Sequence, residues 1–200
     1  FGTVPLVFPE MCHGCGGCMA VCPAGAVGVA FRELGVVERG VARESIPCLT
    51  GRLRIGEAMS PPLMRRVRAL MAQEAARSGA DVVIDAPPGV SCPAMNAVAD
   101  SDVILLVTEP TPFGFYDFSL AIEAFSPLGK PMAVAVNRAG LGDDRVYGFC
   151  RERGLPVVAE IPYRRDIAEH YSKGFILAEM DEAMGARFLD LALSLERLAK

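Results

Sequence analysis

From Pro61 onward the chain alternates helical apolar spacing with short, continuous apolar runs. In 61–79, apolar residues recur every three or four positions with Arg and Glu between them, which predicts an amphipathic helix closed by Gly79. The same pattern predicts further helices at 92–101, 114–129, 143–154, 164–174 and 181–200. Continuous apolar runs predict four short strands at 81–89, 102–110, 131–138 and 156–162.

Strands that alternate with helices imply βαβ units and an α/β fold with a doubly wound, mostly parallel sheet. In such sheets, ligands bind beyond the carboxyl ends of the strands. The predicted strand ends carry Asp85, Glu109, Asn137 and Pro162. These positions are therefore the first candidates for chemistry in this part of the chain.

The N-terminal part of the chain is different, because it is rich in Gly and Cys and has only short apolar runs. The runs at 5–8, 26–31 and 35–39 predict short strands. The stretch 41–60 mixes Pro, Gly and polar residues, which favours a connector. We therefore expect a small α+β module over 1–40, a connector over 41–60 and the α/β part over 61–200.

Composition narrows the possible functions. The chain is 52% hydrophobic and 22% charged, so it can bury a core, and its net charge of -4 argues against nucleic-acid binding. We find neither an uninterrupted apolar run long enough for a membrane span nor the basic and apolar start of a signal peptide, which predicts a cytoplasmic protein. The first residue is Phe1 and not Met, so we expect further residues upstream.

The strongest motif is C-x2-C-x2-C-x3-C-P, formed by Cys12, Cys15, Cys18, Cys22 and Pro23. The odd total of seven cysteines disfavours a disulfide framework. This spacing is typical of ligands to a [4Fe–4S] cluster, and the glycines between the cysteines let the backbone approach the inorganic sulfides. Zinc or free loop thiols are the alternatives, but structural zinc usually uses two separated ligand pairs.

Only one such motif is present, which leaves a gap. In two-cluster ferredoxins the fourth cysteine of each motif serves the other cluster. Cys12, Cys15 and Cys18 would then need a fourth ligand, and Cys22 would need a second cluster. Cys48 could be a substitute ligand, although we favour a loop thiol. The simplest prediction is that 1–40 is half of a ferredoxin-type module whose sister motif lies upstream of Phe1.

Two residues of the α/β part are candidates for nucleotide binding. Asp85 ends a predicted strand before Pro-Pro-Gly, where a carboxylate can hold Mg²⁺ directly or through water, or can simply cap the turn. The Asn137 amide can both donate and accept hydrogen bonds, as the edge of a purine requires, or it can be a turn residue. The residue types alone leave both alternatives open.

Four segments together are more specific: VVIDAPPG at 82–89, VILLVTEPTPFG at 103–114, AVNR at 135–138 and EIPYRRDIAEHYSKG at 160–174. They resemble successive motifs of the MinD/ParA superfamily of deviant P-loop ATPases. With the cysteine motif, the chain resembles the subfamily that has an inserted [4Fe–4S] ferredoxin domain. The resemblance implies that Asp85 is the Mg²⁺-associated switch aspartate, that Asn137 contacts adenine, and that Pro162 belongs to the loop against the base.

The family also has an N-terminal Gly-rich loop with a signature lysine, and here the sequence departs from it. We find no G-x4-G-K-[ST] motif, so the phosphates would lack their main cradle. The resemblance therefore implies an incomplete P-loop NTPase domain. ATP and Mg²⁺ are expected as cofactors only together with an upstream loop, and the 200 residues alone are not expected to hydrolyse ATP.

Three functions are compatible with these features. The first is a [4Fe–4S] protein of the MinD/ParA type that couples nucleotide state to electron transfer or cluster handling, with a redox or iron–sulfur acceptor protein as partner and, by the resemblance, a possible homodimer. The second is a ferredoxin-like electron carrier whose α/β part is a non-hydrolysing docking scaffold. The third is a structural zinc protein attached to an ATPase fragment.

The terminal helix needs separate treatment, because MinD-type proteins can end in a membrane-binding helix. An apolar stripe runs along it, and its other face is acidic as much as basic. A helix that binds a membrane surface would be rich in Lys and Arg. We therefore expect this helix to pack on the sheet, through Met184, Phe188, Leu191, Leu195 and Leu198.

Overall fold

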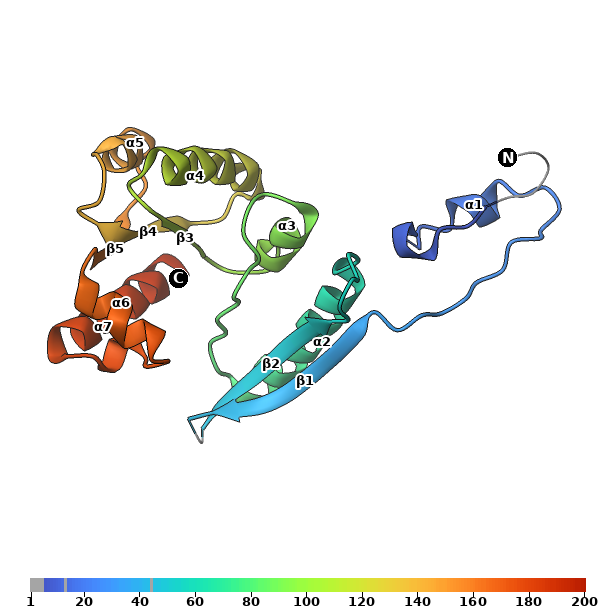
Figure 1. The fold of residues 1–200 in the computed structure, drawn as a ribbon, viewed down its shortest axis with the longest axis horizontal. Coiled ribbons are helices and arrows are strands. Elements are labelled where there is room, and N and C mark those ends of the chain that lie inside the picture. Colours follow the sequence, from blue (N-terminus) through green and yellow to red (C-terminus); the bar gives the residue numbers. More distant parts are fainter. Residues whose placement is uncertain (1–5, 13, 44) are drawn as a thin grey trace. The chain divides into compact units, whose positions relative to one another are not determined.

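The computed structural model describes residues 6–12, 14–43 and 45–200 (Figure 1). The chain divides into two compact units, Phe1–Asp85 and Ala86–Lys200. The first unit ends after a long helix, and the second holds the parallel sheet. The three regions expected from the sequence, with boundaries near 40 and 60, stay a prediction.

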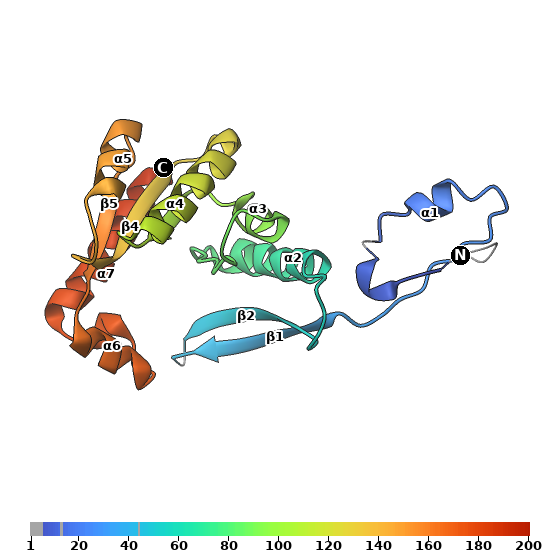
Figure 2. The same cartoon turned by 45° about the horizontal axis from the view of Figure 1, so that its top comes forward.

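The first unit contains a short helical module and a hairpin that carries a helix. The module has the 3-10 turn η1 (Pro9–Met11) and the single-turn helix α1 (Gly17–Ala20). Strands β1 (Gly35–Ala42) and β2 (Ile46–Leu53) form an antiparallel pair. Helix α2 (Pro61–Ser78) packs along this pair, as Figures 1 and 2 show.

The hairpin corrects the sequence prediction at two places. The stretch 41–60, expected to be a connector, contains the end of β1 and all of β2. The strand expected at 26–31 does not form. The strand expected at 35–39 is confirmed as part of β1, and 6–8 is irregular backbone, while Pro5 lies outside the described residues. Glycine at position 51 permits the contact with α2, because a Cβ there would lie only 3.0 Å from Val67 Cγ2.

The second unit is built on a parallel sheet of three strands, in the order β3 (Ile104–Thr108), β4 (Met132–Ala139) and β5 (Val157–Pro162). Its helices connect and cover these strands; they are α3 (Cys92–Val98), α4 (Pro112–Phe125), α5 (Arg145–Arg153), α6 (Arg165–Ser172) and α7 (Glu182–Leu198), with 3-10 turns η2 (Ser126–Leu128) and η3 (Leu177–Glu179). Figure 1 shows α4 and α5 on one side of the sheet and α6 and α7 on the other. The predicted α/β class with a parallel, doubly wound sheet is confirmed.

The fourth predicted strand, 81–89, is wrong for the described structure. This segment is irregular backbone, and Val83 is 96% exposed. A strand exists only when a neighbour pairs with its backbone groups, and neither edge of the β3–β4–β5 sheet pairs with this segment. Asp85, at its end, is therefore exposed and does not lie at a strand tip.

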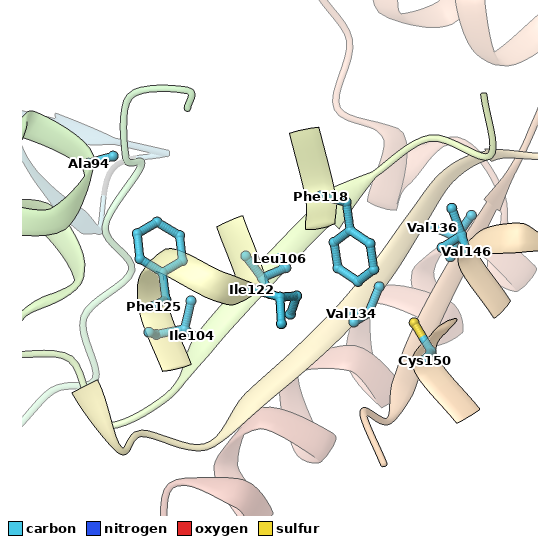
Figure 3. Close-up of a cluster of buried hydrophobic side chains, with 10 residues drawn as sticks. All are labelled: Ala94, Ile104, Leu106, Phe118, Ile122, Phe125, Val134, Val136, Val146 and Cys150. Atoms are coloured by element: carbon cyan, nitrogen blue, oxygen red, sulfur yellow. The ribbon is translucent and has the colours of Figure 1, made fainter. Parts of the chain in front are cut away.

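The core of the second unit lies between the sheet and helices α3, α4 and α5. Strand β4 contributes Val134 and Val136, both fully buried, and α5 contributes Val146 and Cys150 (Figure 3). β3 and α4 supply the remaining large side chains, namely Ile104, Leu106, Phe118, Ile122 and Phe125. Burial of this continuous apolar layer is the main force that holds the strands in register.

Helix α7 lies against β5, as predicted. Met184 is buried, and the other residues of the apolar stripe are half-buried. The Arg187 side chain also donates a hydrogen bond to the backbone carbonyl of Glu160 in β5. Across the part of the chain that the structure describes, every helix is too short or too polar to cross a bilayer.

Candidate functional site

The cysteine motif lies on irregular backbone that glycines bend sharply. Cys12 follows η1, and Cys18 lies within α1. Cys15 is flanked by Gly14 and Gly16, whose φ angles of 64° and 75° lie in the left-handed region that favours glycine. Cys12, Cys15 and Cys18 are exposed and Cys22 is half-buried, so all four thiols are accessible to a metal source.

Backbone amides surround the last sulfur of the motif. The Ala26 N–H donates to Cys22 Sγ at 3.4 Å. This bond and the amide of Ala24 are the main causes that hold the pKa of Cys22 below its ordinary value. Amides that donate to a thiolate stabilise its charged form, which is the form that binds metal. The donor set and these amides fit a [4Fe–4S] cluster.

The cysteines are not gathered into a closed ligand set. Within the described ranges, no group of three or more His, Cys, Asp or Glu side chains is close enough to hold a metal ion. Four thiols on eleven residues of loop have little apolar material to bring them together. In such small sites the ligand arrangement commonly forms as the metal binds.

The other cysteines lie apart from the motif. Cys48 is exposed on β2, where its thiol points toward the carbonyl of Ile46 at 3.6 Å, and Cys92 begins α3. Cys150 is buried in the core, and burial raises its pKa. Cys48 therefore lies on a strand and not in the loop that we favoured from the sequence, and its role as a fourth ligand stays a prediction.

An ion pair that the sequence analysis missed follows the motif. The Arg32 guanidinium binds the Glu57 carboxylate in a two-point contact, with Nη2 3.2 Å from Oε1. The Glu57 side chain is 2% exposed and also accepts the Met59 N–H at 2.8 Å. This pair fastens the segment between the cysteine motif and β1 to the segment that enters α2. The two residues are 25 positions apart, so no local pattern reveals it.

The carboxyl ends of β4 and β5 bring two of the predicted site residues together. Ala139 of β4 pairs with Pro162 of β5, and the Tyr163 N–H donates to the Ala139 carbonyl at 2.9 Å. Asn137 lies two residues before Ala139 and is half-buried. Asp85 belongs to the other unit of the chain.

A β-bulge interrupts β4 at this edge. Val136 pairs with Glu160 and Ala139 with Pro162, so Asn137 and Arg138 together face the single residue Ile161. Arg138 has a φ of 52°, a left-handed conformation that costs an L-residue about 1–2 kcal/mol. Bulges of this kind re-aim side chains and are common beside functional sites.

Neighbouring loops hold the bulge in place. The Arg138 guanidinium pairs with Glu109, at the end of β3, with Nε 3.3 Å from Oε1 and Nη1 3.4 Å from Oε2. The loop after β4 also packs closely on the loop after β3, because a Cβ on Gly142 would lie 1.7 Å from the Pro110 carbonyl oxygen. Glu109 stood among the predicted strand ends, but its contact with Arg138 spans 29 residues and has no local signal.

Comparison with known proteins supports the interpretation of the cysteine motif and that of the α/β fold. Residues 4–27, which include all four motif cysteines, match the family of 4Fe–4S binding domains. Two uncharacterized proteins of Methanocaldococcus jannaschii are similar in sequence. MJ0579 is 34% identical over 93 residues, and MJ0578 is 29% identical over 131 residues. These matches cover 46% and 66% of this chain but only 31% and 45% of the relatives, so the chain spans less than half of either.

Two of the similar solved structures are MinD cell division proteins. MinD of Pyrococcus furiosus matches with a TM-score of 0.57 and 22% identity, over 77% of this chain and 65% of that one. MinD of Aquifex aeolicus matches with a TM-score of 0.59 and 16% identity, over 80% of this chain and 68% of that one. At these identities the likeness concerns the fold. The chain therefore combines a 4Fe–4S binding domain near its N-terminus with the α/β fold of the MinD ATPases.

Proposed function

We propose that this chain belongs to an iron–sulfur protein in which the nucleotide state of a MinD-type ATPase fold is coupled to electron transfer or to cluster handling. The observation that carries the proposal is the joining of two features in one polypeptide. A 4Fe–4S binding motif precedes a parallel sheet with the fold of the MinD ATPases. The cysteine motif alone would suggest a simple electron carrier, and the sheet alone would suggest a simple ATPase.

In the cluster module, Cys12, Cys15, Cys18 and Cys22 would supply thiolate ligands. A bound cluster supplies one-electron transfer at a potential that charge and hydrogen bonds to its sulfurs determine. The Ala26 amide that donates to Cys22 Sγ would lower the negative charge on that sulfur. The exposed position of three of the cysteines fits exchange of electrons, or of the cluster itself, with an acceptor protein.

In the nucleotide module, Asn137 and Pro162 would contact the base, and Asp85 would sense the Mg²⁺ and phosphate end. Asn137 fits this role because its half-buried amide makes no hydrogen bond within the described ranges. The exposed, irregular backbone around Asp85 fits a switch segment, since few contacts would have to break when it moves. The phosphate cradle would come from a loop outside these 200 residues.

The coupling can be tested on the full-length polypeptide that contains these residues, purified without oxygen and with its cluster. We expect the reduction potential of the cluster, followed by EPR, to differ between the ATP-bound, ADP-bound and nucleotide-free protein. Asn137→Ala should retain the cluster and lose the ATP effect. Arg52→Gln, which removes an exposed ion pair on the hairpin, is the matched control and should behave as the unchanged protein.

The alternative is a ferredoxin-like electron carrier in which the sheet is only a docking scaffold. It predicts a stable cluster whose potential is the same with and without ATP. That result, or a full-length protein that binds no ATP, would reject the coupled function and leave the carrier. Cytoplasmic location, a homodimer and an iron–sulfur acceptor partner belong to the same proposal.

A further inference from the structure

The bulge in β4 places a charged residue where it can control the predicted base contact. Asn137 and Arg138 share the bulge, so the orientation of the first depends on the backbone of the second. The last residue of β4 that pairs with β3 is Val136, opposite Thr108. Asn137 therefore lies just beyond the ladder, and β3 hydrogen bonds do not set its direction.

The side chain of Arg138 adds a restraint on the side of β3, while pairing with β5 restrains the other side. Its guanidinium meets Glu109 through two nitrogens, at 3.3 and 3.4 Å. Glu109 follows β3 directly, and its backbone is itself confined, because a Cβ on Gly114 would lie 2.5 Å from the Glu109 carbonyl oxygen. The pair therefore joins the bulge to a rigid point on the neighbouring strand.

The left-handed backbone of Arg138 is a second observation that points to a role for its contact with Glu109. Glycine or asparagine would adopt a φ of 52° at lower cost, yet the position holds a long cationic side chain. Non-glycine residues in this region persist where the surroundings over-determine them, and they cluster at ligand sites. A residue that only formed the turn would not need a guanidinium that pairs with Glu109 at the end of β3.

We propose that Arg138, held by Glu109, is a positioning residue that orients Asn137 toward the base of a bound purine nucleotide and so contributes to the choice of adenine over guanine. This inference rests on the proposed nucleotide site. Arg138 does not itself contact the nucleotide; it fixes the backbone from which the Asn137 amide projects.

The test uses the full-length polypeptide and fluorescent N-methylanthraniloyl derivatives of ATP and GTP. Glu109→Gln and Arg138→Gly each remove the ion pair, and Arg138→Gly also relaxes the left-handed backbone. Each should weaken ATP binding by about two- to fivefold, the range expected when one exposed ion pair is lost. GTP binding should change less, so the preference for ATP falls.

A double-mutant cycle separates positioning from a direct role. Asn137→Ala removes the group that Arg138 would orient, so Arg138→Gly on that background should have no further effect on ATP binding. Arg52→Gln, which removes the exposed pair with Glu38 on the hairpin, is the control and should leave both affinities unchanged.

Each result has one meaning. Unchanged ATP affinity and unchanged ATP-to-GTP preference in Glu109→Gln and Arg138→Gly would overturn the inference while the nucleotide site stands. Additive losses in the cycle would also overturn it, because they would mean that Arg138 acts on the ligand by itself. If the unchanged protein binds neither nucleotide, the proposed function fails, and the inference fails with it.

Discussion

The two units of the chain achieve order by different means. In the second unit, apolar side chains from β3, β4, α4 and α5 form a continuous buried layer, with Val134, Val136 and Val146 fully buried. In the described part of the first unit, no apolar side chain is buried to that degree. The Glu57 carboxylate, by contrast, is almost fully buried there and is paired with Arg32. The comparison teaches that one unit is held by a fully buried apolar core, and the other by half-buried packing of α2 on the hairpin together with the Arg32–Glu57 pair.

This difference has a physical origin in size. A short module with many glycines and cysteines has little apolar surface to bury, and such modules usually depend on metals or other cross-links. The second unit has enough apolar sequence to close a core without them. In the first unit, the loss of one contact should therefore affect mainly the segment that the contact holds. In the second unit, the loss of unfolding free energy should follow the buried volume that a substitution removes.

The largest expected effect comes from the cysteine motif. Cys15→Ala removes a predicted ligand, and we expect loss of most of the bound iron and of the visible cluster absorption. Cys92→Ala changes an exposed cysteine outside the motif and should retain both. The measurement is iron and acid-labile sulfide per chain after anaerobic reconstitution. If Cys15→Ala binds as much cluster as Cys92→Ala, the assignment of the motif is wrong.

The next effect is on the core of the second unit. Val134→Ala removes two buried carbons from β4 and should lower the free energy of unfolding by about 2 kcal/mol, from lost transfer energy and a residual cavity. The same substitution at Val107, on β3 but 66% exposed, should cost less than about 0.5 kcal/mol. Urea unfolding followed by circular dichroism compares them, and equal losses would contradict the assigned core.

The smallest effect concerns the ion pair of the first unit. The Arg32 guanidinium, helped by the Met59 amide, holds the pKa of Glu57 below its ordinary value. A carboxylate with a lowered pKa stabilises the fold above the pKa that it has when unfolded, and this stability is lost as the pH falls through the folded-state value. The hairpin and α2 should therefore lose stability as the pH falls below the ordinary glutamate pKa of 4.5 and through the lower pKa that Glu57 has in the fold.

Glu57→Gln should reduce stability at pH 7 and flatten this pH dependence. Glu38→Gln breaks only the exposed pair with Arg52 on the same hairpin and is the control. The measurement is urea unfolding at several pH values, followed through NMR resonances of β1 and β2. A Glu57→Gln protein with the same acid sensitivity as Glu38→Gln would show that the buried pair does not hold this unit.

The elements of the second unit could be predicted because each has its own periodic signal. The apolar runs of β3, β4 and β5 and the spacing in α4, α5 and α7 indicate their type without knowledge of the neighbours. Strand β2 escaped prediction since Pro47 and Gly51 weaken its pattern, and its pairing with β1 and packing on α2 decide its structure. The error at 81–89 has the opposite cause, because a good strand pattern found no partner.

The candidate sites divide in the same way. The cysteine motif and the strand-end residue Asn137 are visible in the sequence, since their spacing or position is local. The Arg32–Glu57 and Arg138–Glu109 pairs join residues 25 and 29 positions apart. Neither pair could be inferred without the fold.

The most direct test of the central claim is anaerobic reconstitution of the full-length polypeptide with iron and sulfide, in parallel with zinc. We predict a brown protein with equal amounts of iron and acid-labile sulfide, a broad visible absorption that bleaches on reduction, and an EPR signal of a reduced [4Fe–4S] cluster. A colourless chain that takes up only zinc, or takes up no metal, would contradict the account.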